Sequence, residues 1–230
     1  MKSVNVISTL GVSPPVVTEF IDWCLRVGYK PRKVFCIGTK DETVKQSFNV
    51  IKVALDDKFR IKSEYIELPF DDPIKEEDFV LTVEKILDIT KGYKSLFNLA
   101  GGRKNTVLAG YLSAMLTGSK VFHIIHTDVK SLNVDLEKIR YELEIVGKDP
   151  KKYKEYKDKL EPVLFPNPQV YEVIEIPVIP LTYSIKEIIK RAFGGGKEIR
   201  IDLEEIRNEL EYVDYVRITL SGKIIITGLK

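Results

Sequence analysis

The chain has 230 residues, of which 44% are hydrophobic and 30% are charged. That balance excludes a disordered segment, and no apolar run reaches the length of about 18 residues that a membrane span needs. The 36 basic and 34 acidic side chains leave a formal net charge of +2, which is too small for a protein that coats duplex DNA. Any nucleic-acid ligand is therefore expected to be small, or to be held in a local pocket.

Strand patterns and helix patterns alternate over the first 126 residues. Helical spacing of apolar residues separates the strands, as at Val17, Phe20, Ile21 and Cys24. Continuous apolar strands in such a series are typical of an α/β fold with a doubly wound, mostly parallel Rossmann-like sheet. The third strand alternates in polarity and is expected near an edge. The expected strands span residues 3–10, 33–38, 60–68, 95–100 and 120–126, and the helices between them span residues 16–27, 41–57, 74–91 and 101–116.

After residue 127 the pattern changes. Residues 133–162 are strongly charged and are expected to form a solvated helix or a mobile excursion. A strand pattern over residues 168–181 is cut short by Pro177 and Pro180, and a helix pattern follows at residues 184–193.

A glycine triplet predicts the clearest linker of the chain, at Gly194–Gly196. We therefore expect one domain over residues 1–193 and a small C-terminal extension over residues 197–230. The extension pattern predicts a helix at residues 202–210 and a hairpin that turns at Ser221–Gly222. About 34 residues cannot hold an independent core, so the extension must pack on something.

The two cysteines fall in apolar segments, Cys24 in an expected helix and Cys36 in an expected strand. We expect buried thiols in a reducing cytoplasm. The start of the chain resembles a first strand rather than a signal peptide, because no small-residue cleavage site follows it before charged sequence. Few Gln, Met and Cys residues beside many Lys and Glu residues resemble the composition of hyperthermophile proteins.

Candidate binding segments follow from the expected sheet. In a doubly wound sheet, ligands bind beyond the carboxyl ends of the strands, where the strand order reverses. The turns after the first and fourth strands contain glycine beyond the strand itself, and such turns present backbone N–H groups to anions. The segments that supply this edge are Thr9–Ser13, Gly38–Lys40, Ala100–Lys104 and His126–Asp128.

Two cations directly follow Gly101–Gly102 in the turn after the fourth strand, at the start of an expected helix. Arg103 and Lys104 there oppose the helix dipole, which favours anions at a helix N-terminus. A nearby anion would compensate for that cost, although both side chains could simply face solvent. Ser13 precedes Pro14, so it is either a helix cap or a catalytic hydroxyl.

Several familiar signatures are missing from the sequence. It has neither G-x-x-x-x-G-K-[ST] nor G-x-G-x-x-G after the first strand, which disfavours an ordinary NTPase or dinucleotide enzyme. No cluster has metal-ligand spacing, so we expect no metal and no cofactor. The pair R-x4-6-H is also missing, which disfavours a fused effector nuclease.

Two segments together resemble CARF domains, the CRISPR-associated Rossmann-like sensors of cyclic oligoadenylate. They are TLGVSPPVVTE at residues 9–19 and NLAGGRKNTVLAG at residues 98–110. The chain is similar in particular to the stand-alone ring nucleases, which open cyclic tetra-adenylate and switch off type III CRISPR signalling. The resemblance covers roughly residues 1–190.

The resemblance implies a homodimer that holds the ring on its two-fold axis, and a metal-independent reaction. A ribose 2′-OH attacks the neighbouring phosphate and leaves a 2′,3′-cyclic phosphate. Ser13 would orient the 2′-OH or a phosphate oxygen, and Lys104 or Arg103 would stabilise the developing charge. With the strand-end segments, the candidate ligand-binding residues are Thr9, Gly11, Thr39, Gly101, Gly102, Arg103, Asn105 and His126.

Two other functions stay open on the sequence. Some relatives sense the ring without cutting it, so the chain could be a sensor that acts on a partner or on DNA. It could also be a small-molecule enzyme on a Rossmann-like sheet. The expected partners are cyclic tetra-adenylate and a second copy of the chain, whereas duplex DNA and membranes are disfavoured.

Overall fold

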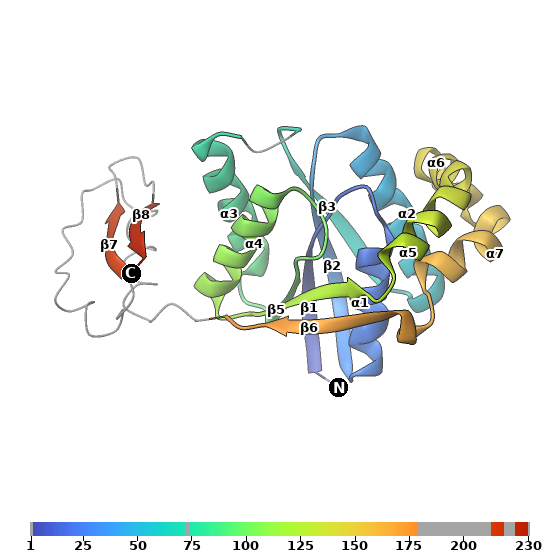
Figure 1. Ribbon diagram of the computed structural model, residues 1–230, viewed down its shortest axis with the longest axis horizontal. Helices are drawn as coiled ribbons and strands as arrows, with labels where there is room; N and C mark the ends of the chain where they lie inside the picture. The colour runs from blue at the N-terminus through green and yellow to red at the C-terminus, as the bar shows by residue number, and fades with distance from the viewer. Residues whose placement is uncertain (1, 72–73, 179–212, 219–223, 230) are drawn as a thin grey trace. The chain divides into compact units, whose positions relative to one another are not determined.

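A six-stranded sheet with the order β3-β2-β1-β4-β5-β6 is the centre of the computed structural model, which describes residues 2–71, 74–178, 213–218 and 224–229 (Figure 1). Neighbouring strands from β3 to β5 pair in parallel, and β6 pairs antiparallel to β5. The predicted doubly wound, mostly parallel sheet is confirmed, with β3 at its edge. The strands are β1 (Lys2–Thr9), β2 (Tyr29–Thr39), β3 (Lys62–Leu68), β4 (Ser95–Asn98), β5 (Lys120–His126) and β6 (Tyr171–Ile176).

Helices cover both faces of this sheet. One core cluster lies under α1 and α2, and a second lies under α3 and α4, on the opposite face (Figure 1). Successive strand residues divide between the two clusters, as Val6 and Ile7 do, because side chains along a strand point to alternate faces. Cys24 and Cys36 are buried free thiols, as predicted. The covering helices are α1 (Pro15–Arg26), α2 (Glu42–Phe59), α3 (Glu76–Thr90) and α4 (Lys104–Thr117).

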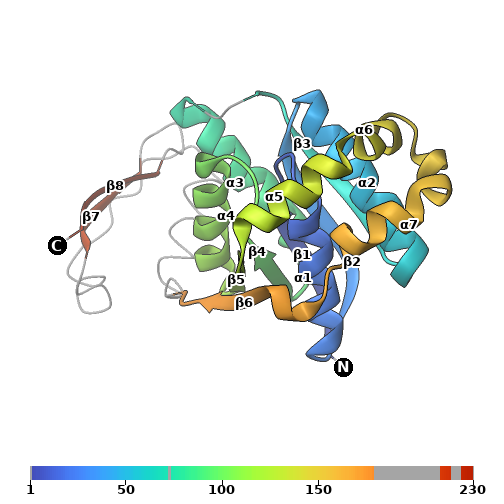
Figure 2. The same cartoon turned by 45° about the vertical axis from the view of Figure 1, so that its right-hand side comes forward.

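The charged segment after β5 forms an outer helical layer against α2 (Figure 2). The prediction of a solvated helix holds for Val129–Lys138, which has no buried residue, but it was wrong for the two helices that follow, where apolar residues at helical spacing face inward between the charges. Val146, Leu160 and Leu164 are fully buried and pack with Val50 and Ala54 of α2. The helices of this layer are α5 (Val129–Lys138), α6 (Arg140–Lys148) and α7 (Tyr153–Leu164).

The end of the chain carries a second, two-stranded sheet. Strands β7 (Val213–Ile218) and β8 (Ile224–Leu229) pair antiparallel, which confirms the predicted hairpin strands. The chain divides into two compact units, residues 1–178 and 179–230. The predicted boundary at residues 193–197 stays a prediction. Other predicted features lie outside the described residues: the helix at 184–193, the linker Gly194–Gly196, the helix at 202–210 and the turn at Ser221–Gly222.

Strand β6 ends at Ile176, directly before Pro177, as the sequence predicted. Among the described helices, none combines the length and the hydropathy needed to cross a membrane.

Candidate functional site

A pocket of about 340 Å³ lies at the carboxyl ends of β1, β2 and β4. The strand order reverses between β1 and β4, and the chain leaves these two strands toward opposite faces of the sheet. The loops after them therefore separate and open a crevice, which is where doubly wound sheets bind ligands. The pocket is lined by Leu10, Gly11, Val12, Ser13, Val16, Thr39, Asp41, Val44, Ala100, Gly101, Gly102 and Arg103.

Most of the residues predicted for the site meet at this pocket. Thr9 lies beneath it, where the buried hydroxyl donates to the Gly101 carbonyl at 2.5 Å. Lys104 and Asn105 are exposed in the first turn of α4 and do not line it. The predicted residues that do line it are Gly11, Ser13, Thr39, Gly101, Gly102 and Arg103.

The two glycine loops approach each other backbone to backbone. A Cβ added to Gly11 would lie 3.1 Å from the amide nitrogen of Gly102. A Cβ added to Gly101 would lie 3.0 Å from the carbonyl oxygen of Thr9. Gly102 has a φ of +93°, in the left-handed region that residues with a Cβ rarely adopt. Larger residues would push the loops apart, so these glycines set the floor of the pocket.

Two helix N-termini give the pocket a local field that favours anions. Neither α1 nor α4 carries an acidic residue in its first turn, and α4 begins with Arg103 at its N-cap followed by Lys104. Helix α2 differs, because Asp41 caps it. Hydrogen bonds from the Thr43 side chain and backbone hold the pKa of Asp41 below its usual range, and the Arg103 charge adds to this effect.

Ser13 does not cap α1. Pro14 occupies the N-cap position, and no side chain makes a capping hydrogen bond there. The capping interpretation is therefore wrong, and Ser13 lines the pocket instead.

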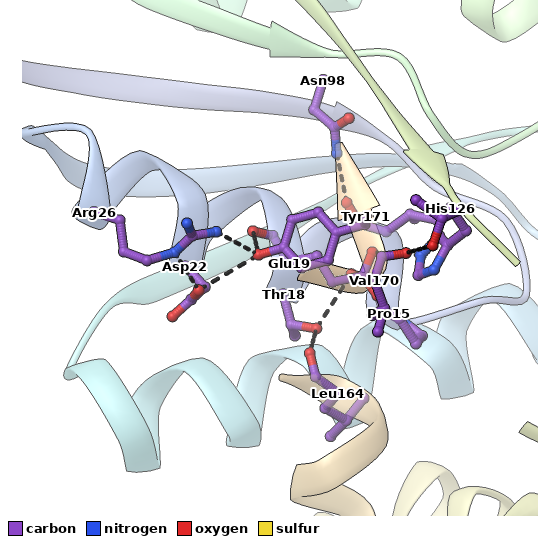
Figure 3. A network of polar contacts seen from close by, with 12 residues as sticks. Pro15, Thr18, Glu19, Asp22, Arg26, Asn98, His126, Leu164, Val170 and Tyr171 are labelled. Carbon is purple, nitrogen blue, oxygen red and sulfur yellow. Dashed lines mark hydrogen bonds and ion pairs between the residues drawn. The ribbon is translucent and has the colours of Figure 1, made fainter. Parts of the chain in front are cut away.

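His126 lies outside the pocket, in a buried polar network around α1 (Figure 3). The ring Nε2 is 2.9 Å from Oε2 of Glu19, and Glu19 is fully buried with no hydrogen-bond partner for Oε1. Burial raises the pKa of Glu19 to about 8 and lowers the pKa of His126. The sequence prediction grouped His126 with the ligand loops, but β5 is one strand away from the point where the order reverses.

The same network ties the later turns of α1 to β6. Arg26 donates to Oδ2 of Asp22 at 2.9 Å and to the Tyr171 hydroxyl at 2.8 Å. The Tyr171 hydroxyl in turn contacts the Glu19 carbonyl oxygen at 3.4 Å (Figure 3). Helix α1 is thus fixed against the β5–β6 edge while its N-terminus faces the pocket.

The sequence did not single out Asn98, which lies buried at the end of β4. The available signal was a polar residue that follows two apolar strand residues, directly before the second glycine loop. Within residues 2–71 and 74–178 and the paired strands β7 and β8, no three His, Cys, Asp or Glu side chains gather as a metal ion would require.

The sequence prediction also missed the apolar lining of the pocket: Leu10, Val12, Val16, Val44 and Ala100.

The fold and the pocket define a Rossmann-like α/β protein with an anion-favouring site between two glycine loops. Residues 13–210 match the family of the CRISPR-associated protein NE0113, and the chain belongs to that family.

A relative of known function agrees with this assignment. Over 123 residues the chain is 28% identical to the CRISPR system ring nuclease SSO2081 of Saccharolobus solfataricus, a match that covers 51% of this chain and 68% of the relative. The resemblance to CARF-domain ring nucleases is therefore confirmed.

A solved structure supports the fold. The chain is similar to Enterococcus italicus Csm6 bound to cyclic hexa-2′-fluoro-hexa-dAMP, with a TM-score of 0.50 and 12% identity. That match covers 92% of this chain and 47% of Csm6, so the chain spans about half of the Csm6 length. A weaker similarity, with a TM-score of 0.38 and 9% identity, covers 99% of this chain and 61% of Can2 from Sulfobacillus thermosulfidooxidans in complex with cyclic tetra-adenylate.

We expect the wild-type chain to lose stability, relative to Glu19→Gln, as pH rises from about 5 to 8. The pKa of Glu19 is about 8 in the folded chain against an ordinary value of 4.5, so the fold keeps a proton that the unfolded chain releases. Raising the pH through this window therefore favours unfolding. Urea unfolding at several pH values measures the difference. Parallel stability curves for the two proteins would show that Glu19 is ionised in the fold.

Proposed function

We propose that this chain is a ring nuclease that binds cyclic tetra-adenylate and cleaves it to linear products with 2′,3′-cyclic phosphate ends, which terminates type III CRISPR signalling. The pocket at the strand-order reversal carries the proposal, in a chain whose relative SSO2081 is a ring nuclease. Two helix N-termini and Arg103 converge on it with exposed backbone from the glycine loops. This combination suits a phosphate diester.

The proposed chemistry takes its nucleophile from the substrate. The ribose 2′-oxygen forms a bond to phosphorus, the bond from phosphorus to the 5′-oxygen breaks, and the 2′ proton is lost while the 5′-oxygen gains one. The protein then contributes in-line geometry and charge stabilisation. Ser13, within the pocket lining, would orient the 2′-OH. Lys104, at the start of α4, would stabilise the charge that develops on the phosphate oxygens.

The size of the pocket supports a homodimer. About 340 Å³ lies at the lower end for a single small ligand, whereas the ring contains four nucleotides. Two copies related by a two-fold axis would present two pockets to opposite sides of one ring. Exposed apolar side chains follow the ends of β1, β4 and β5, and a partner copy would cover them: Val12, Leu108 and Val129 are 68%, 57% and 57% exposed.

We expect light scattering to give twice the chain mass of 26.3 kDa at micromolar concentration. Leu108→Glu places a charge in the proposed interface and should shift the protein toward monomer. Tyr93→Glu is the matched control, because Tyr93 is 51% exposed but precedes β4 at the opposite edge of the sheet. A monomeric wild-type protein, with and without the ring, would contradict the dimer.

Incubation of the pure protein with labelled cyclic tetra-adenylate in EDTA tests the reaction itself. We expect linear products that end in 2′,3′-cyclic phosphate, because the 2′-OH mechanism needs no metal ion. Loss of cleavage in EDTA with recovery in Mg²⁺ or Mn²⁺ would overturn the mechanism. Binding without cleavage would favour a sensor that acts on a partner or on DNA. Neither binding nor cleavage would favour a small-molecule enzyme.

Lys104→Ala and Ser13→Ala separate binding from chemistry. We expect each single-turnover rate to fall, by about 10²–10³ for Lys104→Ala, with a smaller change in ring affinity. Ser13→Ala should leave the melting temperature unchanged, because Ser13 does not cap α1. Controls are Lys52→Ala, on the exposed face of α2, and Ser3→Ala, at the far end of β1. Wild-type rates for both site variants would refute the assignment of these residues.

A further inference from the structure

We propose that Asn98 is a positioning residue for ring cleavage, because its side chain joins the Ser13 loop to the glycine loop that leads into Lys104. The inference rests on the proposed ring nuclease function. Asn98 is fully buried at the end of β4 and does not line the pocket, so it would act through the backbone of the two loops.

One carboxamide reaches three segments of the chain. Its nitrogen donates to the Ser8 hydroxyl at 3.0 Å, in β1, and to the Val16 carbonyl at 2.8 Å, in the first turn of α1. Its oxygen accepts from the backbone N–H of Ala100 at 3.3 Å. Figure 3 shows the Asn98 side chain with a dashed hydrogen bond leaving its amide group. A carboxamide has two N–H donors and an acceptor on one rigid plane, and Asn98 uses all three functions.

These contacts bracket the loop that carries Ser13. Ser8 precedes the loop and Val16 follows it, so a single side chain ties both of its ends to β4. The third contact, to Ala100, holds the start of the loop that runs through Gly102 to Lys104. The relative placement of the two proposed catalytic side chains therefore depends on the Asn98 amide.

A purely structural role would lower stability and leave the reaction of the folded protein unchanged. A positioning role predicts that the bound ring is cleaved more slowly, with little loss of affinity. We call this single-turnover cleavage rate the bound rate. Phosphate contacts tolerate small shifts, but in-line attack does not, and a misplacement of about 1 Å can cost about 10²-fold in rate.

Asn98→Asp tests this with almost no change in shape. The aspartate can still accept from the Ala100 N–H and from the Ser8 hydroxyl, but it cannot donate to the Val16 carbonyl. At pH 8 we expect ring affinity within about threefold of wild type and a single-turnover rate lower by roughly 30- to 100-fold.

A lower pH provides a second readout that a structural role would not move. Burial raises the pKa of a carboxyl group, and the protonated form carries a hydroxyl that can donate to Val16. The variant-to-wild-type rate ratio should therefore rise by at least about fivefold between pH 8 and pH 5. Glu19 on α1 and His126 on β5 titrate in both proteins, so taking the ratio removes their effect.

Asn49→Asp is the matched control, because the Asn49 amide donates to the Gly147 carbonyl at 2.8 Å and joins α2 to α6 away from the pocket. It should cost stability without changing the bound rate. Ser8→Ala removes one partner of Asn98 and replaces Asn98→Asp as the test variant if Asn98→Asp does not fold. We expect its bound rate to fall by about three- to tenfold at unchanged affinity.

The outcomes distinguish this inference from the function on which it rests. A wild-type protein that does not cleave the ring would refute the proposed function and this inference with it. A wild-type protein that cleaves, beside a folded Asn98→Asp or Ser8→Ala variant with the wild-type bound rate, would overturn the inference alone. A rate loss that only follows the unfolded fraction, as in Asn49→Asp, would also overturn it.

Discussion

The close approach of the loops after β1 and β4 is the constraint on which the site depends. Parallel pairing of these strands brings both carboxyl ends to one edge, and the opposite crossovers then separate the chain into α1 and α4. The absence of a Cβ at Gly11 and Gly101 lets the loops touch, and the Thr9 hydroxyl fixes them through the Gly101 carbonyl. The floor of the pocket follows from the loop contact, and the placement of the two helix N-termini follows from the crossovers.

The start of α4 suits a ligand better than it suits the isolated fold. Arg103 and Lys104 place positive charge where the helix dipole is already positive, which costs roughly 0.3–1 kcal/mol for each charge. Helix α2, whose N-terminus also borders the pocket, shows the usual solution with Asp41 at its cap. The Asp41 carboxylate offsets part of this cost, because the Arg103 charge helps to lower the pKa of Asp41 across the pocket.

Periodicity and turn chemistry were enough to predict the sheet and the two glycine loops, because residues close together in the sequence determine these features. Burial of α6 and α7 was not predictable from charge content. Leu160 and Leu164 of α7 pack against α2, and only the tertiary fold brings these helices together. His126 was placed correctly at a strand end, but its ring pairs with Glu19, which is 107 positions away in the sequence. Asn98 was missed for the same reason, because its role lies in contacts with β1 and α1.

The neutral state of Glu19 matters to the pocket as well as to the core. An ionised carboxylate buried in α1 would oppose the positive field that the N-terminus of this helix directs at the pocket. Burial keeps the pKa of Glu19 near 8, so the protonated carboxyl can donate to the neutral His126 ring, 2.9 Å away. The network around α1 therefore fixes the helix to β5 and β6 through hydrogen bonds without placing a negative charge behind the anion site.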